Sequence, residues 1–202
     1  MDGEVPGWAA AAIVAAGRRM DARGWVPATA GNLSVRLGEG RMAVTRSGGH
    51  KGFLDAAGVM VCDLEGRAVT AGARPSAEAL LHGQVYRAFP GAGAVLHGHS
   101  VAATVLTMAG EGAIVLSGYE VLKVFEGVGT HEVSVSVPVV ENDQDIGRMA
   151  VGLAEGVAGM RAGYLIRGHG AYVWGVDMDQ ALARLEGLEF LLSCELERRR
   201  LR

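Results

Sequence analysis

The spacing of apolar and polar residues divides the chain into short alternating strands and amphipathic helices. The pattern predicts strands at about residues 32–37, 41–46, 59–64, 94–99, 113–117, 131–139, 164–167 and 171–174. It predicts helices at about 8–22, 76–89, 101–108, 119–125, 145–157 and from 177 onward, the last with leucines three or four positions apart. Ser76 is the expected N-cap of the second helix. This mixture predicts a single α/β or α+β domain over residues 1–202, with helices covering a central sheet.

Composition and charge exclude several classes of protein. Half of the 202 residues are apolar, which is enough for a sizeable core, and the net charge is only −3. With 19 basic and 22 acidic residues, a dedicated nucleic-acid surface is not expected. The longest apolar stretch, at 5–17, is too short to cross a bilayer, and its flanking charges are the reverse of a signal peptide's. We therefore expect a soluble cytoplasmic protein without membrane partners.

Three of the six histidines lie in a pattern that suggests a metal site. His97 and His99 are two positions apart on an expected strand, so their side chains share a face about 6–7 Å apart. His169 lies between two glycines at the end of another strand. Three imidazoles with an open position are the donor set of a catalytic zinc site. The alternative is a hydrogen-bonded histidine pair and a strand bulge. His50, His82 and His131 are expected to have structural or supporting roles.

Two glutamates are candidates for acid/base chemistry beside such a metal. Glu78 opens the helix that leads into the His97 strand, and Glu120 follows that strand by about twenty positions. The alternative for both is an ordinary first-turn glutamate, which the helix dipole favours. No Walker A loop or GxGxxG motif follows a strand, so a nucleotide-binding fold is not expected.

Polar, glycine-rich turns at 31–34 and 45–52 are candidates for holding an anion. Their backbone N–H groups and hydroxyls could form an anion nest, with Lys51 adding positive charge. Ser76 stands where a helix N-terminus would strengthen that nest. Each segment is equally compatible with an ordinary turn.

Taken in order, the segments GNLSVR (31–36), TRSGGHKG (45–52), RPSAEALLH (74–82), VLHGHS (95–100) and YLIRGHG (164–170) resemble the class II aldolase/adducin-head family. The resemblance covers residues 8–198. It implies a three-layer α/β/α sandwich around a largely antiparallel sheet, assembled as a homotetramer with active sites at subunit interfaces. The segments 118–123, 141–146, 174–175 and 185–191 resemble a branch of the family that dehydrates a ketose phosphate.

The resemblance also implies roles for individual residues. One zinc ion per subunit is expected on His97, His99 and His169, with Glu120 as the acid/base residue. The residues expected at the substrate phosphate are Asn32, Ser47, Gly48 and Ser76, with Lys51 nearby. Glu78 stands where the aldolase branch carries its metal-proximal glutamate. The implied activity is zinc-dependent dehydration of a small sugar phosphate through an enediolate. A sugar-phosphate aldolase or 4-epimerase is the alternative enzyme, and a non-catalytic scaffold is a third possibility.

Overall fold

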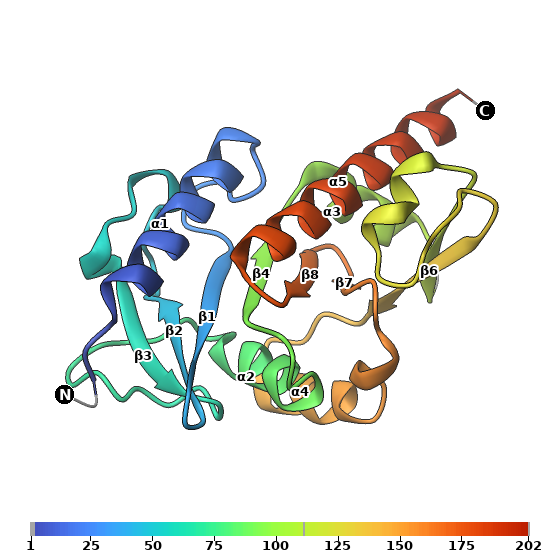
Figure 1. Cartoon of the computed structure of the whole chain (residues 1–202). Coiled ribbons are helices and arrows are strands. Elements are labelled where there is room, and N and C mark those ends of the chain that lie inside the picture. The colour runs from blue at the N-terminus through green and yellow to red at the C-terminus, as the bar shows by residue number, and fades with distance from the viewer. Residues whose placement is uncertain (1–2, 111, 202) are drawn as a thin grey trace.

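The computed structural model describes residues 3–110 and 112–201, which form one eight-stranded sheet with helices on both faces (Figure 1). The strand order is β3-β2-β1-β4-β8-β7-β6-β5. Only the β6–β7 pair is parallel, and the other six neighbouring pairs are antiparallel. The strands are β1 (Asn32–Gly38), β2 (Arg41–Thr45), β3 (Val59–Asp63), β4 (Ala94–Gly98), β5 (Ala113–Ser117), β6 (Ser134–Val140), β7 (Tyr164–Ile166) and β8 (Gly170–Gly175).

Helices cover the two faces unequally. Helices α1 (Gly7–Ala22), α3 (Val101–Ala109) and α5 (Met178–Arg200) lie on one face, and α2 (Ala79–Ala88) and α4 (Ile146–Ala154) lie on the other (Figure 1). Short 3₁₀ helices are η1 (Lys51–Phe53), η2 (Ala56–Gly58), η3 (Glu120–Val124) and η4 (Val157–Gly159). These three layers around a largely antiparallel sheet confirm the fold expected from the sequence.

Each face of the sheet has its own hydrophobic core. The stripe predicted on the last helix packs as expected: Leu185, Leu188 and Leu192 of α5 are fully buried in the core shared with α1 and α3. Burying a leucine side chain contributes about 1.5–3 kcal/mol, so the stripe stabilises the packing of α5 on this face. The second core joins α2 and α4 to the opposite face of the sheet.

Several element boundaries differ from those predicted. Helix α2 begins at Ala79 rather than after Ser76 and has no side-chain cap; the Ser76 hydroxyl accepts from Asn32 Nδ2 (3.1 Å) and from the Glu78 N–H (3.4 Å). In place of the α-helix expected at 119–125, residues 120–124 form the 3₁₀ helix η3, and β6 begins at Ser134 rather than at 131. The last helix begins where it was expected, and Asp177 caps it by accepting from the Gln180 N–H at 2.8 Å.

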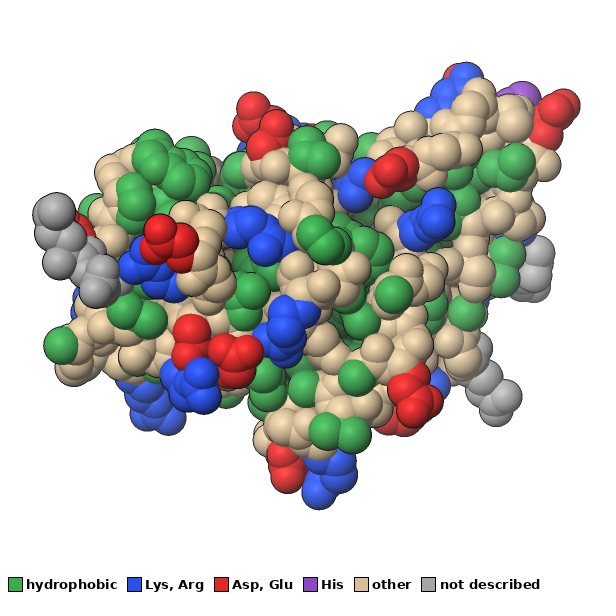
Figure 2. Space-filling model, turned by 60° about the horizontal axis from the view of Figure 1, so that its bottom comes forward, with side chains coloured by type: hydrophobic (Ala, Val, Ile, Leu, Met, Phe, Trp, Pro, Cys, Tyr) green, Lys and Arg blue, Asp and Glu red, His purple; other side chains and the backbone are tan. Residues whose placement is uncertain are grey.

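The surface carries charges of both signs. On the face shown in Figure 2, acidic and basic side chains are interspersed rather than gathered by sign. Among residues 3–110 and 112–201, none of the helices combines the length and apolar character needed to span a bilayer.

Gly83 of α2 provides a test of the packing. A Cβ at this position would lie 1.8 Å from the Leu64 carbonyl oxygen, so we expect Gly83→Ala to lower the free energy of unfolding by about 1–3 kcal/mol or more. In the matched control, Gly152→Ala in α4, the added Cβ meets no atom within 4 Å. That change should stabilise the chain by about 0.5–1 kcal/mol. Urea unfolding of both variants measures the difference, and equal effects would contradict the packing.

Candidate functional site

The pairing of β4 with β8 brings distant histidines together. In this register His97 lies opposite Tyr172 and Gly98 opposite Ala171, so His169, just before β8, reaches the end of β4. The ring centroids of His97 and His99 are 4.5 Å apart, and that of His169 lies 5.0 and 4.5 Å from them. A Cβ on Gly170 would lie 2.1 Å from the Gly98 carbonyl oxygen, so this approach requires a glycine.

The three imidazoles have the separation of ligands around one metal ion. Within the described parts of the chain, one ring nitrogen from each of His97, His99 and His169 lies within 4.8 Å of the others. The Nε2 atoms of His97 and His169 are 3.3 Å apart. Two nitrogens at 2.0–2.1 Å from a tetrahedral zinc ion are separated by about 3.3–3.4 Å. The donor set and its spacing therefore fit a divalent cation.

The protonation states of the rings also suit a metal. Burial lowers the pKa of His97 to about 4 and that of His99 to about 3, so both are neutral at pH 7, the form that binds metals. The Nδ1 atom of His97 lies 3.0 Å from the Ala171 carbonyl oxygen, and that of His169 lies 3.3 Å from Asn142 Oδ1. A proton donated on Nδ1 leaves each Nε2 lone pair facing the centre.

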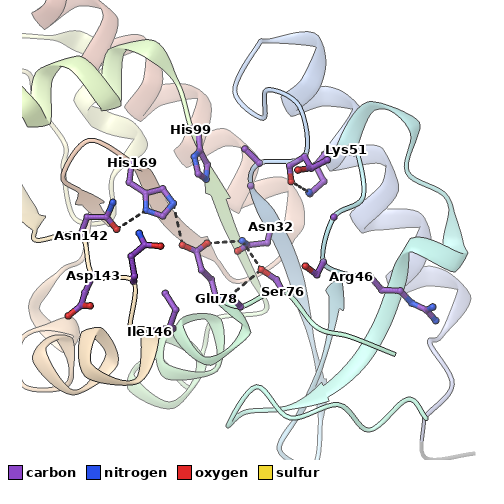
Figure 3. Close-up of a pocket in the computed structure, with 17 residues that line it drawn as sticks. Asn32, Arg46, Lys51, Ser76, Glu78, His99, Asn142, Asp143, Ile146 and His169 are labelled. Carbon is purple, nitrogen blue, oxygen red and sulfur yellow. Dashed lines mark hydrogen bonds and ion pairs between the residues drawn. The ribbon is translucent and has the colours of Figure 1, made fainter. Parts of the chain in front are cut away.

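Glu78 lies in the middle of this group. Its Oε2 is 3.2 Å from His97 Nε2 and its Oε1 is 3.3 Å from His169 Nε2. Burial raises the pKa of the Glu78 carboxyl, but this effect is outweighed by His97, the hydrogen bond from Asn32 and His169. The pKa is lowered overall, to about 2. The carboxylate is therefore ionised. Because His97 is neutral, its contact with Glu78 is not a full ion pair. Figure 3 shows Glu78 between His169 and Asn32.

A cavity of about 380 Å³ opens beside Glu78 (Figure 3). Most residues singled out in the sequence line it, and His97 lies buried next to it, in contact with Glu78 and His169. The lining residues among them are Asn32, Ser47, Gly48, Lys51, Ser76, Glu78, His99 and His169. The candidate metal ligands and the candidate phosphate-binding residues thus face one space.

Lys51 is the cationic side chain deepest in this wall. It is 1% exposed, and its ammonium donates to the carbonyl oxygens of Thr29 (2.8 Å) and Gly49 (2.7 Å). Burial lowers its pKa to about 8. Asn32 also lines the cavity, but its amide nitrogen is already engaged by Glu78 and Ser76.

Glu120 lies elsewhere. It is not among the residues lining the cavity, and its side chain is 69% exposed. It pairs with Lys123 and lies 3.6 Å from His131 Nδ1. The hydrogen bond from Lys123 is the main cause that lowers its pKa. The fold of a single chain does not bring Glu120 to the three histidines, and its acid/base role stays a prediction.

Two residues of the site were not identified from the sequence. Asn142 contacts His169 from the loop after β6, and Tyr172 stacks on His97 with centroids 4.2 Å apart. The polar run 142–145 after a strand was a sequence signal for Asn142. The contact between Tyr172 and His97 follows only from the β4–β8 register. Of the remaining histidines, His82 is buried behind the site, His50 accepts from the Gly52 N–H, and His131 lies beside Glu120.

Comparisons with known proteins identify a family, several sequence relatives and solved structures to which the chain is similar. Residues 11–196 match the family model described as Class II Aldolase and Adducin N-terminal domain. The chain is 66% identical to the methylthioribulose-1-phosphate dehydratase of Gluconacetobacter diazotrophicus, with 96% of each chain covered. It is 62% identical to that of Granulibacter bethesdensis, with 98% of this chain and 95% of the relative covered. The L-fuculose-1-phosphate aldolase structure from Thermus thermophilus superposes with a TM-score of 0.76 at 28% identity, covering 94% of each chain.

The histidine geometry predicts divalent metal binding. We expect the purified chain to bind about one zinc ion, and His97→Ala to abolish binding because two imidazoles remain. His131→Ala removes an exposed histidine outside the group and serves as the control. Elemental analysis after dialysis, together with competition by a chelating dye, measures both. Zinc retained at the parental level in His97→Ala would contradict the assignment.

Proposed function

Because this chain belongs to the class II aldolase and adducin N-terminal domain family, and because its curated relatives are dehydratases, we propose that it dehydrates 5-methylthioribulose 1-phosphate to 2,3-diketo-5-methylthiopentyl 1-phosphate. The enzyme is then a hydro-lyase of methionine salvage acting in the cytoplasm. The observation that carries the proposal is the convergence of three imidazoles beside a cavity with a buried lysine.

The cavity suits a phosphorylated sugar at both of its ends. Lys51, Ser47, Gly48 and Ser76 line the part that we assign to the phosphate, with Asn32 between that part and the histidines. Binding the phosphate orients the remaining carbons toward His99 and His169. Binding energy used at a remote group in this way raises turnover as well as affinity, because it fixes the reacting carbons.

The reaction removes one proton and one hydroxyl from adjacent carbons. A zinc ion held by the three histidines would polarise the C2 carbonyl and so acidify the proton on C3. We assign Glu120 to take that C3 proton and to return a proton to the C4 hydroxyl as it leaves as water. The resulting enol tautomerises to the 2,3-diketone, so atoms balance with one water lost.

Glu120 can take this role only from another copy of the chain. It is exposed and lies outside its own cavity, so we assign it to the site of a neighbouring subunit in a homotetramer. An apolar stripe on α3 supports such an assembly: Val101, Val105 and Met108 are 69%, 43% and 70% exposed at spacings of four and three residues. Helix α3 begins directly after His99, so a copy covering this stripe lies beside the histidines.

A sugar-phosphate aldolase or 4-epimerase of the same family is the second candidate. The observation favouring it is Glu78, an ionised carboxylate within 3.3 Å of two candidate metal ligands, which can act as a base in the same chain. The products distinguish the candidates. Dehydration keeps the five-carbon skeleton, an aldolase releases two shorter fragments, and an epimerase gives an isomer of unchanged mass.

Removing the carboxylate of Glu120 tests the acid/base assignment. We expect Glu120→Gln to lower kcat by about 10²–10⁴-fold while zinc content stays at the parental level, because general acid–base catalysis contributes that much. Product formation by mass spectrometry and elemental analysis measure the two effects. Unchanged turnover would move the role to Glu78 or elsewhere.

Mixed oligomers test whether Glu120 acts across subunits. We expect His97→Ala and Glu120→Gln to have little activity alone. Each proposed site needs an intact His97 from one copy and an intact Glu120 from its neighbour, and random mixing at equal amounts gives this combination at about one site in four. Refolding the two variants together should therefore restore about one quarter of parental activity. Light scattering reports the oligomeric state, and native mass spectrometry verifies the mixing. Mixed tetramers without activity would contradict action across subunits.

The buried ammonium of Lys51 predicts a pH-dependent affinity for anions. The protonated form binds anions and predominates below its pKa of about 8, so sulfate affinity should fall as the pH rises through that value. A bound anion favours the protonated form, which moves the midpoint upward. Lys51→Met should bind sulfate weakly, with little pH dependence from 6 to 10. Calorimetric titration with sulfate, which stays a dianion throughout, measures this. If sulfate affinity changed equally with pH in the parent and in Lys51→Met, the assignment of Lys51 would be contradicted.

A further inference from the structure

A row of buried polar side chains connects the candidate metal centre to the interior between β1 and α2. Glu78, His82 and Tyr86 are four positions apart, and Asn32 and Ser34 are two apart. These spacings place each set on one face of its element, and the two faces meet. All five residues are buried, with at most 7% exposure. We call these five residues the β1–α2 polar chain.

Consecutive members of the β1–α2 polar chain are hydrogen-bonded. Asn32 Nδ2 donates to Glu78 Oε2 at 2.8 Å, and Asn32 Oδ1 forms a hydrogen bond with His82 Nε2. On the other side of the imidazole, His82 Nδ1 is 2.7 Å from Ser34 Oγ. Ser34 Oγ in turn lies 2.8 Å from the Tyr86 hydroxyl. Both ring nitrogens of His82 are thus engaged, which excludes His82 as a metal ligand in this arrangement.

The orientation of the Asn32 amide sets the direction of the other bonds in the row. Its nitrogen donates to Glu78 Oε2 and to Ser76 Oγ. The Asn32 carbonyl oxygen then faces His82, whose Nε2 must carry the proton. A neutral ring protonated on Nε2 accepts at Nδ1, so Ser34 donates to it and accepts from Tyr86. Burial lowers the pKa of His82 to about 3, in keeping with a neutral ring.

We infer that His82 is a positioning residue whose Nε2–H fixes the orientation of the Asn32 amide and thereby holds the Glu78 carboxylate between His97 and His169. The two ends of an asparagine amide are nearly equal in size, so only their hydrogen-bond partners distinguish them. Without the His82 N–H, the buried Asn32 oxygen has no donor, so the amide moves to reach another one and its nitrogen draws away from Glu78 Oε2. The carboxylate then loses the contact that holds it at the metal centre proposed above, on which this inference rests.

The tautomer of His82 tests the inference in the metal-free protein. Nitrogen-15 NMR of the imidazole distinguishes a protonated Nε2 with a bare Nδ1 from the reverse. We expect the Nε2–H form across pH 6–8, with slow exchange of that proton because the ring is buried. The Nδ1–H form, or a doubly protonated ring, would overturn the inference whether or not the chain binds zinc.

Zinc affinity tests the consequence. His82→Leu should weaken zinc binding about 10–100-fold, the range typical for partners that orient a metal site. His82→Gln can supply an N–H near the position of Nε2 and should retain most of the affinity. Gln84→Leu is the matched control, since it loses a partly buried hydrogen bond from the same helix to the Ala150 carbonyl oxygen (2.7 Å). It should lose comparable stability but keep the parental zinc affinity.

The Asn32→Ala variant tests whether His82 affects zinc binding through the Asn32 amide or through a general loss of stability. If His82 acts through this amide, His82→Leu should weaken zinc binding no further when Asn32 is already alanine. An additive loss in the double variant would overturn the inference, as would a parental affinity in His82→Leu alone. A parent chain that binds no zinc would overturn the metal centre instead, and the NMR result would then decide the role of His82.

Discussion

The lateral pairing of β1, β4 and β8 is the constraint on which the candidate site depends. Because of the two registers, Asn32, His97 and Tyr172 stand side by side across three neighbouring strands. His169 joins this row because Gly170 allows its backbone to approach Gly98. A slip of one residue in either register would turn the side chains to the opposite face of the sheet. The position of these side chains is therefore determined by the pairing of the strands rather than by the loops.

Local patterns accounted for much of the fold. The leucine spacing of α5, the Asp177 cap and the alternation in the strands all specify elements that the structure contains. These signals are readable because each depends on residues within one or two turns of one another. The paired histidines at 97 and 99 are local in the same sense, as are the glycines around His169 and the polar turns at 31–34 and 45–52. The resemblance to a known family then gave specific roles to these residues, most of which line the cavity.

Other features could not be placed from local sequence patterns alone. Ser76 has the sequence of a helix cap, but Asn32, 44 positions away, uses its hydroxyl, and α2 begins three residues later. Glu120 follows the metal-ligand strand closely in sequence, yet η3 holds it at the surface beside Lys123. The role of His82 was equally out of reach, because its spacing from Glu78 shows a shared helix face but not the strand that faces it.

The separation of the candidate ligands along the chain would link metal supply to folding. His97 and His169 are 72 positions apart, so an ion shared between them would join two strands that are distant in sequence. Such a cross-link acts only in the folded chain, since the ligands converge only when β4 and β8 are paired. Resistance to unfolding then rises with the logarithm of the free metal concentration. Chelation would accordingly loosen the centre of the sheet, even though no strand there has lost a hydrogen bond.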